Sequence, residues 1–208
     1  MNQIRTRVLS GELKYDNTVI LTYKIEYPEM VFSFYELGRN AFNRYNRNLA
    51  INLENYVRGE LYQSAKETYD YNKKNGFPVM VYEFINVFEI TYNKDFIVSL
   101  YMDKYEFAGG AHGNTIRSSQ NWNLRTGRQL PLSYFYPNNP NYVVDILKNI
   151  IGQISANPEN YFDDYCKLVL DTFNPESFYI TEKDVAIYFQ AYDIAPYSTG
   201  IPTFLIPR

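Results

Sequence analysis

The sequence predicts an α+β fold: antiparallel sheets with a long helix and a helical pair packed on one face. Apolar residues alternate with period two in two separate blocks, one near the N-terminus and one after residue 79. Between these blocks, apolar residues recur at steps of three and four, and two shorter stretches with the same spacing follow after residue 142. Because no low-complexity linker separates the halves, we expect two tightly associated modules, residues 1–104 and 105–208.

The N-terminal module should open with a hairpin and a long helix. Residues 6–27 read as two strands around a turn at Asp16-Asn17, and a helix follows over residues 34–72, ended by Asn75-Gly76. The stripe expected to face a sheet comprises Phe42, Tyr45, Leu49, Leu53, Tyr56, Val57 and Leu61. The other face is rich in asparagine, a poor helix former, so tertiary packing must stabilise the helix. These asparagines are Asn40, Asn43, Asn46, Asn48, Asn52 and Asn55.

A meander of three strands is expected next. Residues 79–92 alternate, with Tyr82, Phe84, Phe88 and Ile90 on one face. A second strand over residues 96–105 follows a turn at residues 93–95, and a third over residues 115–124 ends before Thr126-Gly127. Short turns of this kind join antiparallel neighbours, so we predict an antiparallel meander.

The C-terminal half should be helical first and then return to strands. We expect helices over residues 142–154 and 160–173, a closing hairpin over residues 177–180 and 185–191, and a last short strand over residues 203–206. Cys166 is the only cysteine, so no disulfide forms within the chain. Its helical spacing with Val169 suggests a small buried apolar side chain rather than a nucleophile.

Composition narrows the function. The chain has 208 residues, 46% hydrophobic and 21% charged, which excludes a disordered chain. A net charge of −3 gives no electrostatic footprint for nucleic acid, and the basic pair Arg44 and Arg47 is interpreted as a solvated face. No run of 18 apolar residues occurs, so this segment should not insert into a membrane. Tyrosine, with 22 residues, is unusually abundant, and binding surfaces favour it.

Catalytic and metal-binding patterns are largely absent. The chain has one histidine and one cysteine, which nearly excludes a zinc site with the usual ligands, and we predict no metal and no cofactor. The histidine, His112, lies in the glycine-rich segment Gly109–Gly113. One interpretation is a tight connection between strands, with His112 hydrogen-bonded to nearby backbone. The other is a polar loop that presents His112 to a ligand. Adjacent acids such as Asp163 and Asp164 point apart on a helix and do not form a glycosidase pair.

A second unusual segment leaves the predicted strand near residue 188 and runs to residue 202. It contains three tyrosines, two prolines and a glycine, and it cannot be regular sheet. Tyrosine and proline bury contact area at low entropic cost, so an exposed loop of this composition would suit binding of a protein or a glycan. The alternative, in which its aromatic rings fold back on the core, stays open.

Two stretches together resemble a known family. They are residues 105–130, with the motif Gly-Gly-Ala-His-Gly, and residues 178–202, with Ile194–Tyr197 followed by Gly200-Ile201-Pro202. Both resemble the extracytoplasmic module of RsiV-type anti-sigma factors, bacterial lysozyme sensors, and the module that precedes the catalytic domain in some peptidoglycan deacetylases. The preceding part of the chain looks like the smaller module that accompanies it. The resemblance implies ligand contacts from Tyr192, Ile194, Pro196, Tyr197 and His112, and structural roles for Gly109, Gly110, Gly113 and Gly200.

The resemblance therefore implies a non-catalytic recognition domain for c-type lysozyme or another cell-wall-related protein or glycan. A carbohydrate-binding accessory module is an alternative, for which tyrosine rings would stack on sugars. An envelope enzyme that uses His112 as acid or base is a third, disfavoured because no second catalytic group converges on it in the sequence. The domain is expected to be extracytoplasmic if it is excised from a longer protein, and cytoplasmic if Met1 is native and the chain complete.

Overall fold

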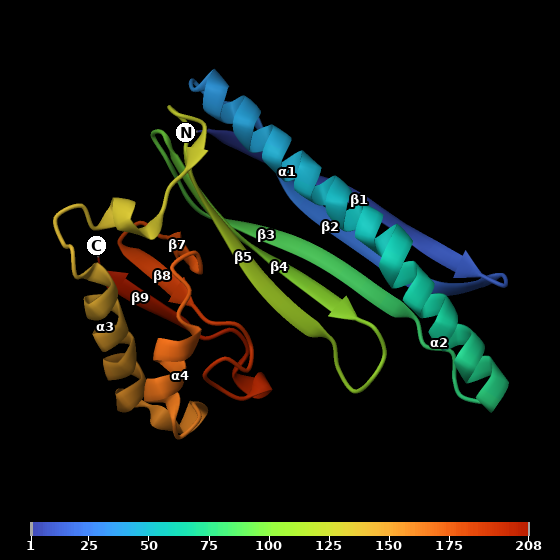
Figure 1. The fold of residues 1–208 in the computed structure, drawn as a ribbon. Helices are drawn as coiled ribbons and strands as arrows, with labels where there is room; N and C mark the ends of the chain where they lie inside the picture. The colour runs from blue at the N-terminus through green and yellow to red at the C-terminus, as the bar shows by residue number, and fades with distance from the viewer. Residues whose placement is uncertain (1, 208) are drawn as a thin grey trace. The chain divides into compact units, whose positions relative to one another are not determined.

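The computed structural model describes residues 2–207 and confirms the α+β prediction (Figure 1). The chain divides into two compact units. Unit 1 comprises Met1–Phe88 and Met102–Ile116, and unit 2 comprises Glu89–Tyr101 and Arg117–Arg208. Three strands, β3 (Tyr82–Lys94), β4 (Ile97–Phe107) and β5 (Asn114–Asn123), contribute residues to both units. The module boundary predicted after residue 104 falls inside β4 and stays a prediction.

Unit 1 begins with the predicted hairpin. Strands β1 (Gln3–Tyr15) and β2 (Thr18–Phe32) pair antiparallel. Asp16 and Asn17 join them with φ angles of 48° and 59°. Two consecutive left-handed residues match the right-handed twist of paired strands, and Asp and Asn tolerate that conformation. The short-range chemistry of the turn thus explains why the hairpin could be predicted.

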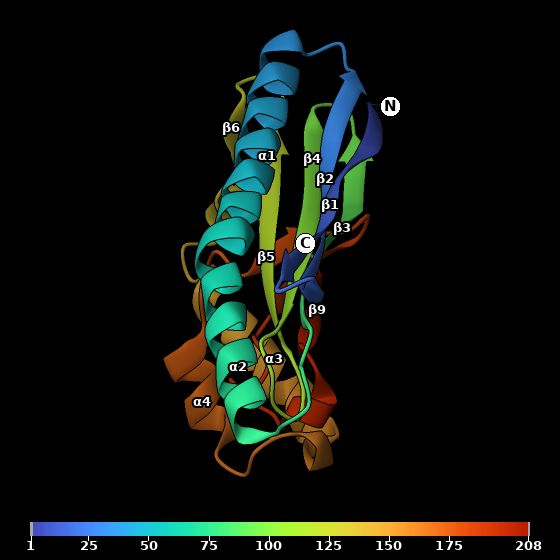
Figure 2. The same ribbon diagram turned by 90° about the vertical axis from the view of Figure 1, so that its right-hand side faces the viewer.

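The long helix of unit 1 is also confirmed. It consists of α1 (Glu36–Tyr56), the π-helical segment η1 (Val57–Leu61) and α2 (Tyr62–Asn75), which follow one another without a break (Figure 2). Gly76 ends it with φ 74°, the left-handed cap that favours glycine. The π-helical segment was not predicted, because the apolar spacing alone does not distinguish it from regular helix.

The buried face of this helix differs from the predicted stripe. Tyr45 is 44% exposed, whereas Asn46 is fully buried and donates a hydrogen bond from its Nδ2 to the Phe42 carbonyl, at 3.0 Å. Asn46 was predicted on the outer face, and that prediction is wrong. The buried residues include several small side chains, which let the helix approach β2 closely. In order they are Gly38, Phe42, Asn46, Ala50, Val57, Leu61, Ala65, Tyr69 and Asn72.

One pairing in the six-stranded sheet departs from the antiparallel expectation. Its order is β1-β2-β3-β4-β5-β6, and β2 pairs with β3 in parallel, from Leu21 with Tyr82 to Ile25 with Asn86. The long helix carries the chain from the end of β2 back to the end of the sheet where β2 began. The next strand, β3, can therefore run in the same direction as β2, which is the connection that parallel pairing needs. Local sequence patterns predicted both strands and the helix between them. The parallel pairing of the strands depends on how that helix connects them.

Unit 2 contains a second sheet and the helical pair. Strands β7 (Phe178–Ile180), β8 (Asp184–Tyr188) and β9 (Thr203–Pro207) form it in that order, with antiparallel pairing. Helices α3 (Tyr142–Ala156) and α4 (Tyr165–Thr172) contact each other, and α3 contacts β9 (Figure 1). The second helix begins later than predicted: Pro158–Asn160 forms a 3-10 turn, η3, Tyr161 is extended, and α4 starts only at Tyr165. The two-residue strand β6 is Arg128–Gln129, and Leu132–Phe135 forms the 3-10 turn η2.

The core of unit 2 draws on both helices and the small sheet. Ile146, Ile150 and Ile154 of α3 pack with Val169 of α4 and with Ile187 of β8, all essentially buried. Cys166, by contrast, is exposed, so its predicted burial is wrong. Val169 is the only buried residue of α4, a narrower apolar face than the spacing suggested. Among residues 2–207, no helix is both long and apolar enough to cross a bilayer.

Candidate functional site

The tyrosine- and proline-rich segment forms the loop between β8 and β9 of unit 2. It turns through the 3-10 segment η4 (Tyr197–Thr199), and Gly200 closes it with φ 74° and ψ −133°. A side chain at Gly200 would be strained because L residues rarely adopt this conformation. The structural role that the resemblance implied for Gly200 stays a prediction.

The loop divides its residues between surface and core. Tyr192 is 54% exposed and Pro196 is exposed, whereas Ile194 and Ala195 are buried in the core of unit 2. Ile194 therefore anchors the loop, and we leave it out of the candidate contact surface. The two alternatives for this segment both hold in part, because some of its side chains face solvent and others pack inward.

Tyr192 and Tyr197 come together as a pair of rings. Their centroids lie 5.6 Å apart with an interplanar angle of 30°, a stacked arrangement. Tyr197 is half-buried, so it supports the more exposed ring of Tyr192. Such a pair offers aromatic contact area whose orientation is already restricted before a ligand arrives.

The backbone at Tyr192 is held in an uncommon conformation. Its φ is 71°, which costs a bulky residue of order 1 kcal/mol and persists only where the surroundings enforce it. Two hydrogen bonds enforce it here. The Gln190 amide donates to Asp193 Oδ2 at 2.8 Å, and the Asp193 amide donates to the Gln190 carbonyl at 3.1 Å.

Asp193 is partly buried beneath this turn. Burial raises the pKa of its carboxyl, and the hydrogen bond from the Gln190 amide opposes that rise. The folded state therefore favours the protonated carboxyl, and this group's contribution to stability falls as pH rises through the raised pKa. Asp193 acts through the turn geometry and not as a contact on the surface.

Gln190 ties the loop to β5. Its Oε1 accepts a hydrogen bond from the Arg117 amide at 2.9 Å, and its Nε2 donates to the Arg117 carbonyl at 2.8 Å. A side-chain amide thus pairs with a strand as another strand would. On the far side of the loop, the Phe162 amide donates to the Ile194 carbonyl at 3.1 Å, and Thr199 Oγ1 donates to the Asn160 carbonyl at 3.0 Å.

The glycine-rich segment joins β4 to β5 in unit 1. Gly109 and Gly110 have φ angles of 87° and 103°. At Gly113 an added Cβ would lie 2.4 Å from ring atoms of Tyr105, so close approach requires glycine there. Positive φ and close approach are the two properties that the sequence predicted for these glycines.

His112 is exposed, and its Nδ1 lies 3.0 Å from the Gly113 carbonyl. This contact agrees with the interpretation of a tight connection in which the histidine bonds nearby backbone. His112 belongs to unit 1 and the Tyr192–Tyr197 pair to unit 2, so we assign no joint site to them. A role for His112 in ligand contact stays a prediction.

Three residues of this site were not predicted from the sequence: Arg117, Gln190 and Asp193. The sequence did contain one signal: Gln190 lies at the end of a predicted strand and Asp193 comes three positions later. Because Asp side chains often accept hydrogen bonds from backbone amides in tight turns, this spacing indicates a turn held by Asp193. The partner of Gln190 lies 73 residues away in the chain, and no local pattern identifies it. Within residues 2–207, no three or more His, Cys, Asp or Glu side chains gather as metal ligands would.

Comparisons with known proteins give two matched regions. Residues 14–115 match the family model described as Deacetylase PdaC, and residues 135–208 match the one described as Protein of unknown function (DUF3298). These matches are consistent with a chain of two modules. No match was found among curated proteins.

Solved structures show the same fold. A DUF3298 family member from Bacteroides fragilis NCTC 9343 is similar with a TM-score of 0.73 and 18% identity, covering 99% of this chain and 90% of that one. A DUF3298 family protein from Pseudomonas aeruginosa PAO1 is similar with a TM-score of 0.64 and 17% identity, covering 99% and 91%. Identities this low establish the shared fold alone.

Proposed function

We propose that this chain is a non-catalytic recognition domain of the cell envelope, in which the loop around Tyr192 and Tyr197 contacts a protein partner. The partner that we propose is a c-type lysozyme, as in the RsiV-type sensors that the sequence resembles. The observation that carries the proposal is the stacked tyrosine pair, in which the exposed Tyr192 has a backbone held at positive φ and packs on the half-buried Tyr197. We further propose an extracytoplasmic location, which a lysozyme partner requires.

The physical support is preorganisation. Binding orders side chains and loops at a cost that is smaller when the loop is already held. Here Gln190 and Asp193 hold the backbone on either side of Tyr192, while Ile194 is packed into the core. Tyrosine is among the residues that most often dominate binding energy at protein interfaces.

We do not propose deacetylation for this chain, although the family model that matches residues 14–115 is described by that activity. Hydrolysis of an amide needs an activated water, which a metal ion or a positioned base supplies. Within the described residues of that region, no cluster of side chains fits a metal, and His112 Nδ1 contacts backbone.

Calorimetric titration of the chain with a c-type lysozyme tests the proposal. We expect binding at micromolar or tighter affinity. Tyr197→Ala should weaken it by at least about 2 kcal/mol, roughly 30-fold. Tyr192→Asn removes the exposed ring but retains a residue that tolerates positive φ, so it should also weaken binding without unfolding the loop.

The matched control is Tyr71→Ala, which removes a 62% exposed tyrosine from unit 1 and should leave the affinity unchanged. Circular dichroism establishes that each variant is folded. Equal affinity of wild type and Tyr197→Ala for lysozyme would exclude this loop from the interface. The absence of a heat signal with lysozyme at about 100 μM, roughly 100-fold above the expected dissociation constant, would reject lysozyme as the partner.

A glycan-binding module is the second candidate, and the exposed ring of Tyr192 is the observation that favours it. Sugar rings stack on aromatic faces, and this ring offers one outward face. Titration with a chitin oligosaccharide in place of lysozyme tests it. Binding that Tyr192→Asn abolishes would support the glycan, and the absence of binding would reject it.

A further inference from the structure

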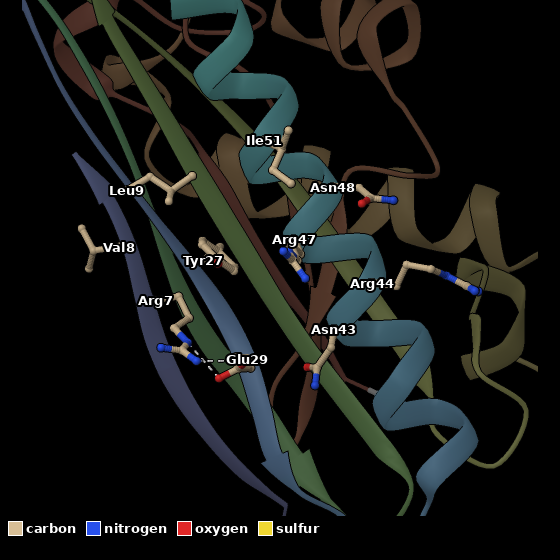
Figure 3. A pocket seen from close by; sticks show the side chains of 10 residues that line it. All are labelled: Arg7, Val8, Leu9, Tyr27, Glu29, Asn43, Arg44, Arg47, Asn48 and Ile51. Carbon is tan, nitrogen blue, oxygen red and sulfur yellow. Dashed lines mark hydrogen bonds and ion pairs between the residues drawn. The ribbon is translucent and has the colours of Figure 1, made fainter. Parts of the chain in front are cut away.

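A groove of about 720 Å³ opens in unit 1 between α1 and the β1–β2 hairpin (Figure 3). This volume is within the range of sites that hold small ligands. Part of its lining is apolar, from Val8, Leu9 and Tyr27 of the hairpin and Ile51 of the helix. Val8 is 49% exposed and Ile51 is 40% exposed, so apolar surface faces the solvent on both sides of the groove.

The charged lining is predominantly basic. Three arginines, Arg7, Arg44 and Arg47, stand against one acid, Glu29, in a chain whose net charge is −3. The Glu29 carboxylate is already engaged, because Oε2 accepts hydrogen bonds from Arg5 Nε and from Arg7 Nε, the latter at 2.9 Å. These two arginines lower the pKa of Glu29, so it stays ionised and paired at neutral pH.

The other polar groups of the groove divide into engaged and available ones. The Asn43 amide is engaged, because Oδ1 accepts from the Met30 amide at 2.7 Å and Nδ2 donates to the Met30 carbonyl at 2.9 Å. Arg44 and Arg47 are exposed, and neither forms an ion pair or a side-chain hydrogen bond with any residue between 2 and 207. The available charged groups are therefore hydrogen-bond donors.

Figure 3 shows how these donors lie. Arg47 is on the side of α1 that faces Tyr27, and Arg44 lies one turn earlier, farther from the hairpin. A guanidinium offers a planar fork of N–H groups that fits carboxylate and phosphate. Arg47 thus brings such a fork into a groove that the Tyr27 ring also lines, and Arg44 adds positive charge at the rim.

We infer that this groove is a binding site for a small amphipathic anion. Its carboxylate or phosphate would pair with Arg47, assisted by Arg44, and its apolar part would lie against Tyr27, Val8 and Ile51. From the sequence alone, Arg44 and Arg47 are interpreted as a solvated face. What changes the interpretation is the groove itself, which places apolar side chains from residues distant in the sequence next to these two cations. The site is in unit 1 and does not depend on the proposed function of the loop in unit 2.

Nuclear magnetic resonance titration of the 15N-labelled chain tests the inference. The probes are 4-phenylbutyrate and phenyl phosphate, with the uncharged 4-phenylbutyramide as the matched ligand. We expect the two anions to shift the amide signals of residues around Tyr27 and Arg47 at millimolar concentration, and the amide to bind at least about tenfold more weakly. A preference between the anions distinguishes carboxylate from phosphate.

The matched variants are Arg47→Gln, within the groove, and Arg128→Gln, an exposed arginine of unit 2. Arg47→Gln should weaken binding of the anions at least about tenfold, and Arg128→Gln should leave it unchanged. Three results would overturn the inference: no shifts near the groove at 20 mM of either anion, equal binding of the uncharged amide, or unchanged affinity of Arg47→Gln with a wild-type spectrum otherwise.

Discussion

At the scale of single residues, polar side chains with well-defined partners hold the backbone where its path is irregular. Gln190 bonds both backbone groups of Arg117, and Asn43 bonds both backbone groups of Met30. Each of these amides satisfies donors and acceptors that would otherwise cost free energy when removed from water.

Tyr56 gives a prediction at this scale. Its hydroxyl donates to Glu106 Oε2 at 3.0 Å, within unit 1, and burial followed by this hydrogen bond raises the pKa of Tyr56 to about 12. Between pH 10 and 12 the folded state keeps a proton that the unfolded chain loses, so stability should fall as pH rises. Tyr56→Phe should make the free energy of unfolding less dependent on pH across this window, as measured by urea denaturation.

The control for this prediction is Tyr71→Phe, which changes a 62% exposed ring of the same helix. It should keep the wild-type dependence on pH between 10 and 12. Identical slopes for wild type and Tyr56→Phe would show that the Tyr56 proton is not linked to folding.

At the scale of elements, the long helix is stabilised by its contacts with the sheet more than by its own residues. Asparagines and β-branched residues are poor helix formers, yet the helix runs from Glu36 to Asn75. Its buried side chains pack on β2, and Asn43 joins it to the end of that strand. Tertiary packing therefore provides the stabilisation that the intrinsic helix propensity of these residues does not, as the asparagine content predicted.

Asn43→Ala tests this account of the helix. The change removes two hydrogen bonds to Met30 and leaves its partly buried backbone groups without them, so we expect a loss of about 2–3 kcal/mol in the free energy of unfolding. Asn52→Ala is the matched change at an exposed position of α1, and it should stabilise slightly, by about 0.5 kcal/mol, through helix propensity. Urea denaturation measures both, and equal effects would contradict the role of Asn43.

At the scale of the whole molecule, the two units share three strands although each has its own core. Strands β3, β4 and β5 pass from one unit to the other along the chain. Each of these strands has one part in unit 1 and the other part in unit 2. Unfolding of one unit would therefore disorder part of each strand and destabilise the other unit. Small single domains usually unfold in one cooperative step, and shared strands extend that expectation to both units.

Ile25→Val tests the coupling. Ile25 is fully buried in unit 1, and the change should cost about 0.5–1.5 kcal/mol. The single tryptophan, Trp122, is buried in unit 2 and reports on that unit by fluorescence. We expect the Trp122 transition in urea to move by the same amount as the far-ultraviolet circular dichroism. A Trp122 midpoint that stays unchanged while circular dichroism shifts would show independent units.

The sequence by itself determined which segments are strands and helices, because these depend on local chemistry. Asp16-Asn17 makes the first turn, Gly76 ends the long helix, and period-two alternation marks β3. The same local chemistry marked the glycines of the β4–β5 connection. It also indicated that Tyr192 and Tyr197 lie in an irregular loop, since prolines and glycine exclude regular sheet there.

Only the tertiary structure decided which of these segments pair and which side chains meet. Parallel pairing of β2 with β3, burial of Asn46 and Ile194, exposure of Cys166, and the link from Gln190 to Arg117 all depend on residues distant in sequence. The same holds for the groove that Arg47 and Tyr27 both line. The spacing of residues along one helix or strand determines which residues share a face. Whether those residues are buried in the core, anchor a loop or form a binding site depends on the element that packs against that face.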